Sequence, residues 1–340
     1  MYFVYLLKKY IKNFFIFLFS LSFLYLLIDI IANFSKLPNS SNLQILYSVY
    51  VLGYSFENFY PLALIFSFLY SIYYLIKYNY MVSFYSLGFS KRKILFPFLF
   101  LAFIVYLLFL VLDNTNYVYL NQKAKNIISS KKIKKENLFL KHKNNIVYIK
   151  ELKPLLKKAI GLKIFVLNNM ELKKIINIKE AIYQNNVWNG TDVTIITINN
   201  DKMNVKKLHN LSVLKNFEPL VLSNLKRLDS LSIKDALLAI KIFKDIKLNK
   251  IIAVLLYKIL TPLSIILLLI YFMYISPIHQ RISNISVFMI KSIFFVIFIW
   301  GINLLIYKFV KQGVLSPFVL FLPLLFIVIL DFYVIKKENL

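Results

Sequence analysis

Residues 94–112 read ILFPFLFLAFIVYLLFLVL, a run of 19 positions without a charged side chain. At about 1.5 Å per helical residue, roughly 20 apolar residues cross a hydrocarbon core of about 30 Å. Five other segments approach this length and composition. The six predicted transmembrane helices cover 13–33, 58–76, 94–112, 255–277, 288–307 and 312–331. They form two groups of three, separated by a long segment that is more polar.

The composition supports a membrane protein, because 59% of the residues are hydrophobic and soluble domains are nearer half apolar. The net charge of +27 is one criterion for nucleic-acid binding. However, the sequence contains no nucleic-acid motif, and its apolar runs argue against that class. An anionic lipid is the better candidate partner. The chain has no cysteine, which excludes disulfides and cysteine-ligated metals.

The N-terminus has some features of a signal peptide, since Lys8, Lys9 and Lys12 precede an apolar run. The run from Phe14 to Asn33 is long for the apolar region of a signal, and no small-residue cleavage site follows it. We therefore expect a retained first transmembrane helix.

The cations of the short loops predict the orientation, because cytoplasmic loops are enriched in Lys and Arg. With a cytoplasmic N-terminus, eleven cations lie inside and three lie in short outside loops. The inside cations are Lys8, Lys9, Lys12, Lys77, Lys91, Arg92, Lys93, Arg281, Lys291, Lys336 and Lys337, and the outside ones are Lys36, Lys308 and Lys311. Both termini and residues 77–93 are thus predicted to be cytoplasmic. Residues 113–250 are predicted outside, since long domains translocate largely regardless of charge.

The middle segment is predicted to be rich in β-strands. Residues 145–149, 162–167 and 192–198 are short runs of β-branched and aromatic residues. The sequence WNGT at 188–191 places Asn-Gly between strand-like runs, which predicts a hairpin turn. It is formally also a glycosylation sequon, but the turn is the favoured interpretation.

A helix is predicted to lead the chain back into the membrane. Ser232 and Asp235 have the spacing of a capping box. Ile233, Leu237 and Ile240 then recur at helical spacing. We expect an amphipathic helix here.

No residue pattern predicts catalysis or a metal site. The sequence lacks a phosphate-binding loop, and its three histidines are scattered: His142, His209 and His279. The serines have no identifiable His/Asp constellation.

Five ionisable residues lie within or beside the predicted spans: Asp29, Glu57, Lys258, Lys291 and Asp331. A charge at the bilayer centre costs roughly 2.5–3.5 kcal/mol on insertion scales, so such residues are candidates for function. All five lie near a span end, where a long side chain can snorkel to the headgroups. For Lys258 and Asp29, toward the outer leaflet, anchoring and function are equally compatible with the sequence. For Lys291 and Asp331, anchoring is favoured.

Several segments together resemble the lipopolysaccharide-export permease family (LptF/LptG), in order and spacing over nearly the whole chain. They are KKYIKNF at 8–14, YPLALIFSFLYSIYYL at 60–75, MVSFYSLGFSKRKIL at 81–95, NNIVYI at 144–149, KILTPLSIILLL at 258–269 and VLSPFVLFLPLLFIVIL at 314–330. LLIDIIANF at 26–34 and the NNIVYI region lean toward the LptG branch.

The resemblance implies an α+β membrane protein with six transmembrane helices, three plus three, and an inserted periplasmic β-jellyroll domain. Residues 1–112 would hold helices one to three, 113–250 the periplasmic domain and re-entry helix, and 251–340 helices four to six. The family implies an inner-membrane permease subunit of an ABC transporter that extracts lipopolysaccharide and passes it to a periplasmic jellyroll bridge. It pairs with a homologous second permease and binds a cytoplasmic ATPase dimer. The partner ATPase uses ATP, so this chain is expected to be non-catalytic and to bind no cofactor.

The resemblance assigns residues 77–93 as the loop that couples the permease to the ATPase. In the family this loop forms a short helix before a glycine, here Gly88, and an acidic residue usually stands eight positions ahead; here that position is Tyr80. Helical spacing places Met81, Phe84, Tyr85 and Gly88 on one face, which is predicted to dock in the ATPase. The alternative is a helix lying in the membrane interface.

The predicted lipid-binding residues are Lys36, Lys258 and Asp29, because they lie toward the outer leaflet. Two other functions stay open. A membrane-anchored periplasmic binding or sensing protein would need no docking surface for a cytoplasmic motor. A membrane-embedded glycolipid transferase would need acidic catalytic residues at the membrane face, where the sequence has only isolated ones.

Overall fold

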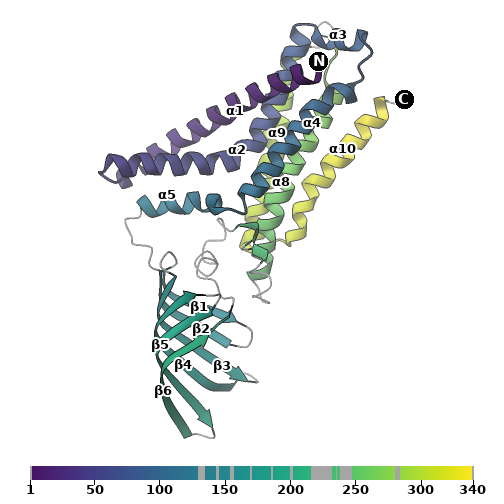
Figure 1. The fold of residues 1–340 in the computed structure, drawn as a ribbon. Helices are drawn as coiled ribbons and strands as arrows, with labels where there is room; N and C mark the ends of the chain where they lie inside the picture. The colour runs from purple at the N-terminus through teal and green to yellow at the C-terminus, as the bar shows by residue number, and fades with distance from the viewer. Residues whose placement is uncertain are drawn as a thin grey trace. The chain divides into compact units, whose positions relative to one another are not determined.

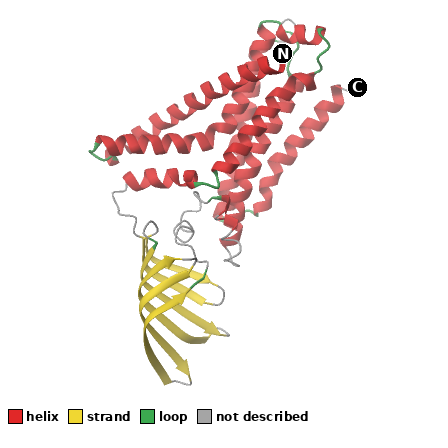
Figure 2. Cartoon of the chain, viewed as in Figure 1, coloured by secondary structure: helices red, strands yellow, loops and turns green. Residues whose placement is uncertain are grey.

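The computed structural model divides into two compact units, one helical and one containing a sheet (Figures 1 and 2). The helical unit comprises Met1–Ile128 and Ile252–Leu340, and the sheet unit comprises Ser129–Ile251. The structure describes residues 2–128, 135–142, 145–153, 157–168, 171–184, 187–199, 202–215, 232–234, 236–237, 247–279 and 284–338.

Long helices form almost all of the helical unit. Its N-terminal part contains α1 (Tyr2–Asn33), α2 (Ser41–Lys77), α3 (Tyr80–Ser86), α4 (Lys91–Leu112) and α5 (Leu120–Ile128). Its C-terminal part contains α8 (Lys247–Ile275), α9 (Ile285–Gln312) and α10 (Leu322–Glu338). The short 3₁₀ segments are η1 (Phe34–Lys36), η2 (Asn116–Tyr119) and η4 (Pro317–Phe321).

Six helices in the described part of the chain are long and apolar enough to cross a membrane, which confirms the predicted three-plus-three arrangement. Several boundaries differ from the prediction. The last span was expected at 312–331, but Gly313 ends α9 with a left-handed φ of 88° and Pro317 begins η4. Glycine tolerates that φ at a helix end. Proline suits a helix start, because the first N–H groups of a helix have no partner within the helix and proline therefore loses no hydrogen bond there.

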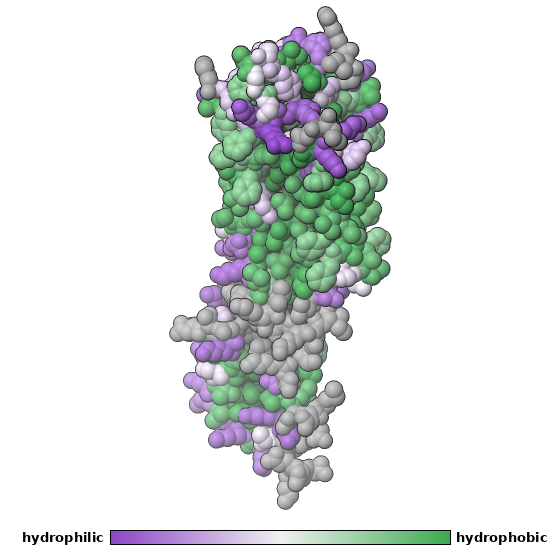
Figure 3. Space-filling view, turned by 90° about the vertical axis from the view of Figure 1, so that its right-hand side faces the viewer, coloured by the Kyte–Doolittle hydropathy of each residue, from purple (hydrophilic) through white to green (hydrophobic). Residues whose placement is uncertain are grey.

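The core of the helical unit is apolar and is tied together by a few buried hydrogen bonds. The Tyr10 hydroxyl of α1 donates to the carbonyl oxygen of Leu64 in α2 at 3.0 Å, and Asn13 Nδ2 donates to Ser71 Oγ at 2.9 Å. Many large apolar side chains on α1, α9 and α10 are instead exposed. Figure 3 shows the resulting hydrophobic surface of the helical unit. Such a surface requires lipid or a partner protein to cover it.

The N-terminus, α3 and the C-terminus lie at the same end of the helical unit (Figure 1). The rings of Tyr2 and Phe89 are 4.4 Å apart between centroids, and Lys91 Nζ lies 3.0 Å from Glu338 Oε1. The segments predicted to be cytoplasmic therefore meet at one end.

The sheet unit contains a six-stranded antiparallel sheet in which each strand pairs with the next along the chain. Its strands are β1 (Lys135–His142), β2 (Asn145–Lys153), β3 (Lys158–Asn168), β4 (Glu171–Gln184), β5 (Val187–Asn199) and β6 (Lys202–Val213). Leu162, Ile178 and Val193 occupy paired positions across three strands and are each at most 2% exposed. The predicted strands are confirmed, whereas a jellyroll is not confirmed.

The predicted turn at 188–191 is wrong, because WNGT lies inside β5. Asn189 pairs with Ile182 on one side and Ser212 on the other. Gly190 serves packing instead: a Cβ there would lie 2.6 Å from Ile178 Cγ2. A glycine inside a strand commonly marks such a close approach rather than a turn.

The predicted helix after the sheet is only partly within the described residues. Helical backbone is present at 233–234 and 236–237, and the Ala236 N–H donates to the Ser232 carbonyl oxygen at 2.9 Å. Asp235 and Ile240 lie outside the described residues.

Candidate functional site

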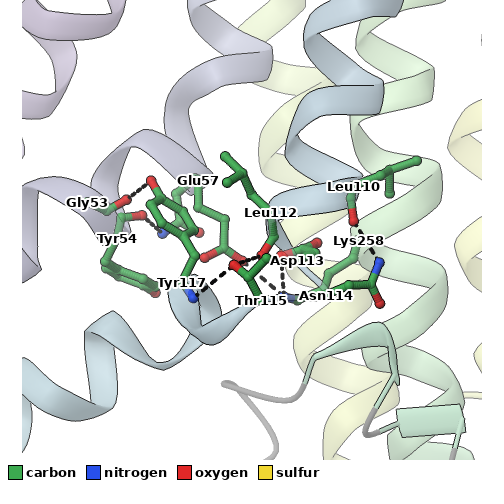
Figure 4. Close-up of polar contacts among 11 residues, drawn as sticks. Gly53, Tyr54, Glu57, Leu110, Leu112, Asp113, Asn114, Thr115, Tyr117 and Lys258 are labelled. Atoms are coloured by element: carbon green, nitrogen blue, oxygen red, sulfur yellow. Dashed lines mark hydrogen bonds and ion pairs between the residues drawn. The ribbon is translucent and has the colours of Figure 1, made fainter.

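Three ionisable side chains meet where α2, α4 and α8 pack together (Figure 4). Lys258 Nζ of α8 donates to Glu57 Oε1 of α2 at 3.0 Å and to Asp113 Oδ1, just after α4, at 2.9 Å. The side chains of Lys258, Glu57 and Asp113 are 11%, 16% and 9% exposed. We call these three residues the carboxylate–lysine triad.

The chain that follows α4 places Asp113 in the triad. The Asp113 N–H donates to the carbonyl oxygen of Phe109, so the residue still belongs to the last helical turn. Thr115 Oγ1 then accepts a hydrogen bond from the N–H of Tyr117 and caps η2. This sharp turn keeps the carboxylate beside the membrane helices.

A hydrogen bond between Tyr117 of η2 and Gly53 of α2 lies beside the triad. The Tyr117 hydroxyl donates to the Gly53 carbonyl oxygen. Burial and then the nearby Glu57 and Asp113 carboxylates raise the pKa of Tyr117, so its hydroxyl remains a donor. A Cβ on Gly53 would lie 2.4 Å from Leu120 Cδ1, so a larger residue there would require the Leu120 side chain to move.

The triad changes the role expected for Lys258. The sequence predicts that its ammonium faces anionic groups of a lipid, but the structure gives it two carboxylates of this chain. Removing one partner from a buried ion pair leaves an uncompensated charge and is strongly destabilising. The geometry thus favours a role in holding α2, α4 and α8 together.

Glu57 was a candidate from the sequence, whereas Asp113 was missed. Asp113 directly follows the uncharged run that ends at Leu112. Its position at a span end could have marked it as a candidate. Lys258 is 201 and 145 positions away from its two partners. Local spacing in the sequence could therefore not predict that these residues meet.

The other two predicted lipid-binding residues lie near the junction of α1 and α2. Lys36 is exposed on η1. Asp29 lines a cavity of about 160 Å³ between α1, α2 and α5, and its Oδ2 accepts a hydrogen bond from the Tyr47 hydroxyl. Their contact with lipid stays a prediction.

The predicted coupling loop forms a helix before Gly88, but its aromatic face points inward. Met81 is 0% exposed, and Phe84 and Tyr85 pack against the core of the helical unit. Burial, and secondarily the carboxylate of Glu338, raises the pKa of Tyr85. The expectation that Met81, Phe84 and Tyr85 form an exposed docking face is therefore wrong.

The opposite side of α3 and the following turn are exposed. Tyr80, Val82 and Leu87 are 40%, 38% and 72% exposed. Gly88 has a φ of 79° and ends the helix, as predicted, with open space around it. We call Tyr80, Val82 and Leu87 the outer face of α3.

The cations after Gly88 bind other helices of this chain. Lys91 Nζ contacts Glu338 Oε1 of α10 and donates to the carbonyl oxygen of Tyr274 in α8, each at 3.0 Å. Arg92 Nε donates to the Tyr274 hydroxyl at 3.2 Å. The segment carrying α3 is thus fastened to α8 and α10.

The remaining candidates are separate from these groups. Lys291 is exposed on α9, as anchoring predicts, but Asp331 on α10 is only 6% exposed. Its carboxylate oxygens have no hydrogen-bond partner among the described residues. The same part of the chain contains no group of three or more His, Cys, Asp or Glu residues placed to hold a metal ion.

A comparison with protein families identifies a relationship over nearly the whole chain. The model of the family "Lipopolysaccharide export system permease LptF/LptG" matches residues 4–337. The chain belongs to this family. It is a multi-pass membrane permease, with family members acting as permease components of lipopolysaccharide export. The match does not separate LptF from LptG, so the leaning toward LptG is not supported. No curated protein matches the chain.

Proposed function

We propose that this LptF/LptG permease is one subunit of an ABC transporter that extracts lipopolysaccharide from the inner membrane. The family match over 4–337, together with six helices able to span a membrane, carries the proposal. The lipid would pass to a periplasmic jellyroll bridge. The other partners would be a homologous second permease and a cytoplasmic ATPase dimer that hydrolyses the ATP.

The end of the helical unit that holds both termini and α3 is proposed to face the cytoplasm. The excess of short-loop Lys and Arg at this end supports that orientation. The sheet unit is then proposed to be periplasmic, because it follows α4, a span that leads away from this end, and the short helix α5.

The outer face of α3 is proposed to dock in the ATPase. Leu87 is 72% exposed, Tyr80 and Val82 are also exposed on this face, and a docked partner would bury these side chains. Met81 and Phe84 anchor the same helix in the core of the helical unit. A movement of the ATPase would therefore be transmitted to the membrane helices.

The lipid site is proposed at the opposite end, around Lys36 and the cavity beside Asp29. Lys36 is exposed on η1, and Phe34 on the same segment is 75% exposed. A Lys–phosphate contact is charge-assisted and contributes about 1.5–3 kcal/mol. An ammonium and an exposed apolar side chain on one segment match the boundary between the phosphates and acyl chains of the lipid.

A photo-crosslinking experiment tests this function. A photoreactive amino acid at Phe34 is expected to capture lipopolysaccharide in cells, because it lies beside Lys36 in the proposed site. Lys36→Ala in the same chain should reduce the capture several-fold. The matched control is the probe at Ile290, which is 56% exposed on α9 near the proposed cytoplasmic end. Equal capture at Phe34 and Ile290 would count against the proposed lipid site.

A further inference from the structure

The cavity beside Asp29 has a ring of aromatic and polar side chains. Tyr25 and Asp29 come from α1, Tyr47 and Tyr54 from α2, and Lys125 from α5. Its volume of about 160 Å³ is below the roughly 300–1,000 Å³ of sites that enclose a whole drug-sized ligand. The cavity is therefore suited to a headgroup-sized fragment.

The Asp29 carboxylate has no cation partner among the described residues. It accepts one hydrogen bond, from the Tyr47 hydroxyl, and Tyr47 is 2% exposed. Asp29 is half-buried, and a nearby positive charge stabilises the ionised form of such a carboxylate. Lys125 lines the same cavity but forms no ion pair with Asp29, so a cationic ligand could bind directly at the carboxylate.

The tyrosine rings around Asp29 favour an ammonium group. The centroids of Tyr25 and Tyr54 are 6.2 Å apart at an interplanar angle of 61°. Aromatic faces attract cations through their quadrupole. A primary ammonium has three N–H donors, which match a carboxylate and hydroxyl oxygens, whereas a quaternary ammonium has none. A primary ammonium therefore matches these groups better than a quaternary one.

Lys125 adds a charge of the opposite sign at the same cavity. Its side chain is exposed on α5, lines the cavity and forms no ion pair within the described residues. An ammonium in this position is suited to a phosphate. The cavity therefore offers a carboxylate to a cation and an ammonium to an anion.

We propose that this cavity binds a phosphoethanolamine group, with its ammonium at Asp29 and its phosphate at Lys125. The inference deepens the proposed lipid site and rests on it for the biological setting. Two sources share this chemistry: the headgroup of a membrane phospholipid, and a phosphoethanolamine substituent on the exported glycolipid.

Native mass spectrometry of the full chain in detergent tests the proposal in two arms. One arm offers equal amounts of phosphatidylethanolamine and phosphatidylcholine with identical acyl chains. The other offers lipopolysaccharide with and without phosphoethanolamine. We expect at least a tenfold preference for the ethanolamine form in one arm, and that arm identifies the source. No preference in either arm would overturn the proposal.

Variants of the lining residues test whether the headgroup preference arises in this cavity. Asp29→Asn retains an oxygen for the Tyr47 hydroxyl but removes the charge, and should reduce the preference to about one to one. Ala124→Leu should have the same effect by filling the cavity, since Ala124 lines it and is 3% exposed. The control is Lys123→Ala, on the same helix but outside the lining, which should keep the full preference.

A folded Asp29→Asn or Ala124→Leu chain that keeps the preference would refute the assignment. The result is independent of the crosslinking at Phe34. Lipopolysaccharide capture at Phe34 without any headgroup preference would defeat this inference and leave the proposed function intact.

Discussion

Lys258→Met is expected to lower the free energy of unfolding of the helical unit by about 3–5 kcal/mol, because it leaves two buried carboxylates without their shared cation. Both partners lie within 3.0 Å of Lys258 Nζ and are at most 16% exposed. Unfolding in mixed detergent–SDS micelles, followed by circular dichroism, would measure the change. Methionine retains the apolar stem, so lost packing contributes little.

Two controls separate the ion pairing from a general effect of removing lysine. Lys308→Met removes an exposed lysine of α9 and should change stability by less than about 0.5 kcal/mol. The triple variant Lys258→Met, Glu57→Gln, Asp113→Asn removes all three charges and should recover most of the loss, since neutral replacement of buried ion pairs is often tolerated. Wild-type stability of Lys258→Met alone would show that the triad does not hold the helices together.

Leu87→Asp is expected to release the ATPase and abolish transport while the permease stays inserted and folded. Leu87 is 72% exposed on the outer face of α3, so the change costs the isolated chain little. A packed apolar side chain at the centre of an interface contributes about 2 kcal/mol or more, which corresponds to a roughly 30-fold loss of affinity. Co-purification of the ATPase from native membranes would measure it.

Phe84→Asp is the informative comparison, because Phe84 packs against the core of the helical unit. It should lower the thermal stability of the permease itself, whereas Leu87→Asp should not. Tyr80→Glu restores the acidic residue that the family usually has and should be tolerated, since Tyr80 is 40% exposed. Normal ATPase recovery and transport for Leu87→Asp would place the docking surface elsewhere.

The sequence predicted the six spans because a bilayer imposes a simple requirement: about 20 apolar residues whose backbone groups pair within the segment. It also predicted three strands, because β-branched and aromatic runs fit a pleated surface. Boundaries were less certain. Gly313 and Pro317 set the end of α9 and the start of η4 through their backbone conformations, which a hydropathy pattern does not describe.

The errors have a common physical cause, which is tertiary packing. Asn189-Gly190 has the local chemistry of a turn, yet Gly190 is needed in a strand because Ile178 lies against it. The spacing of Met81 and Phe84 predicted one face of α3 but not whether that face turns inward. The triad joins residues far apart in the chain, so no local pattern could predict it.

The central claim, an ATP-driven permease for lipopolysaccharide, is tested most directly by transfer in a reconstituted system. The chain would be purified from its native membrane with its ATPase and second permease and placed in vesicles containing lipopolysaccharide. ATP should then move lipopolysaccharide onto the soluble jellyroll bridge protein, and the same complex with Leu87→Asp should move none. ATP-independent transfer, or no transfer by a complex that hydrolyses ATP and includes the bridge protein, would contradict the account.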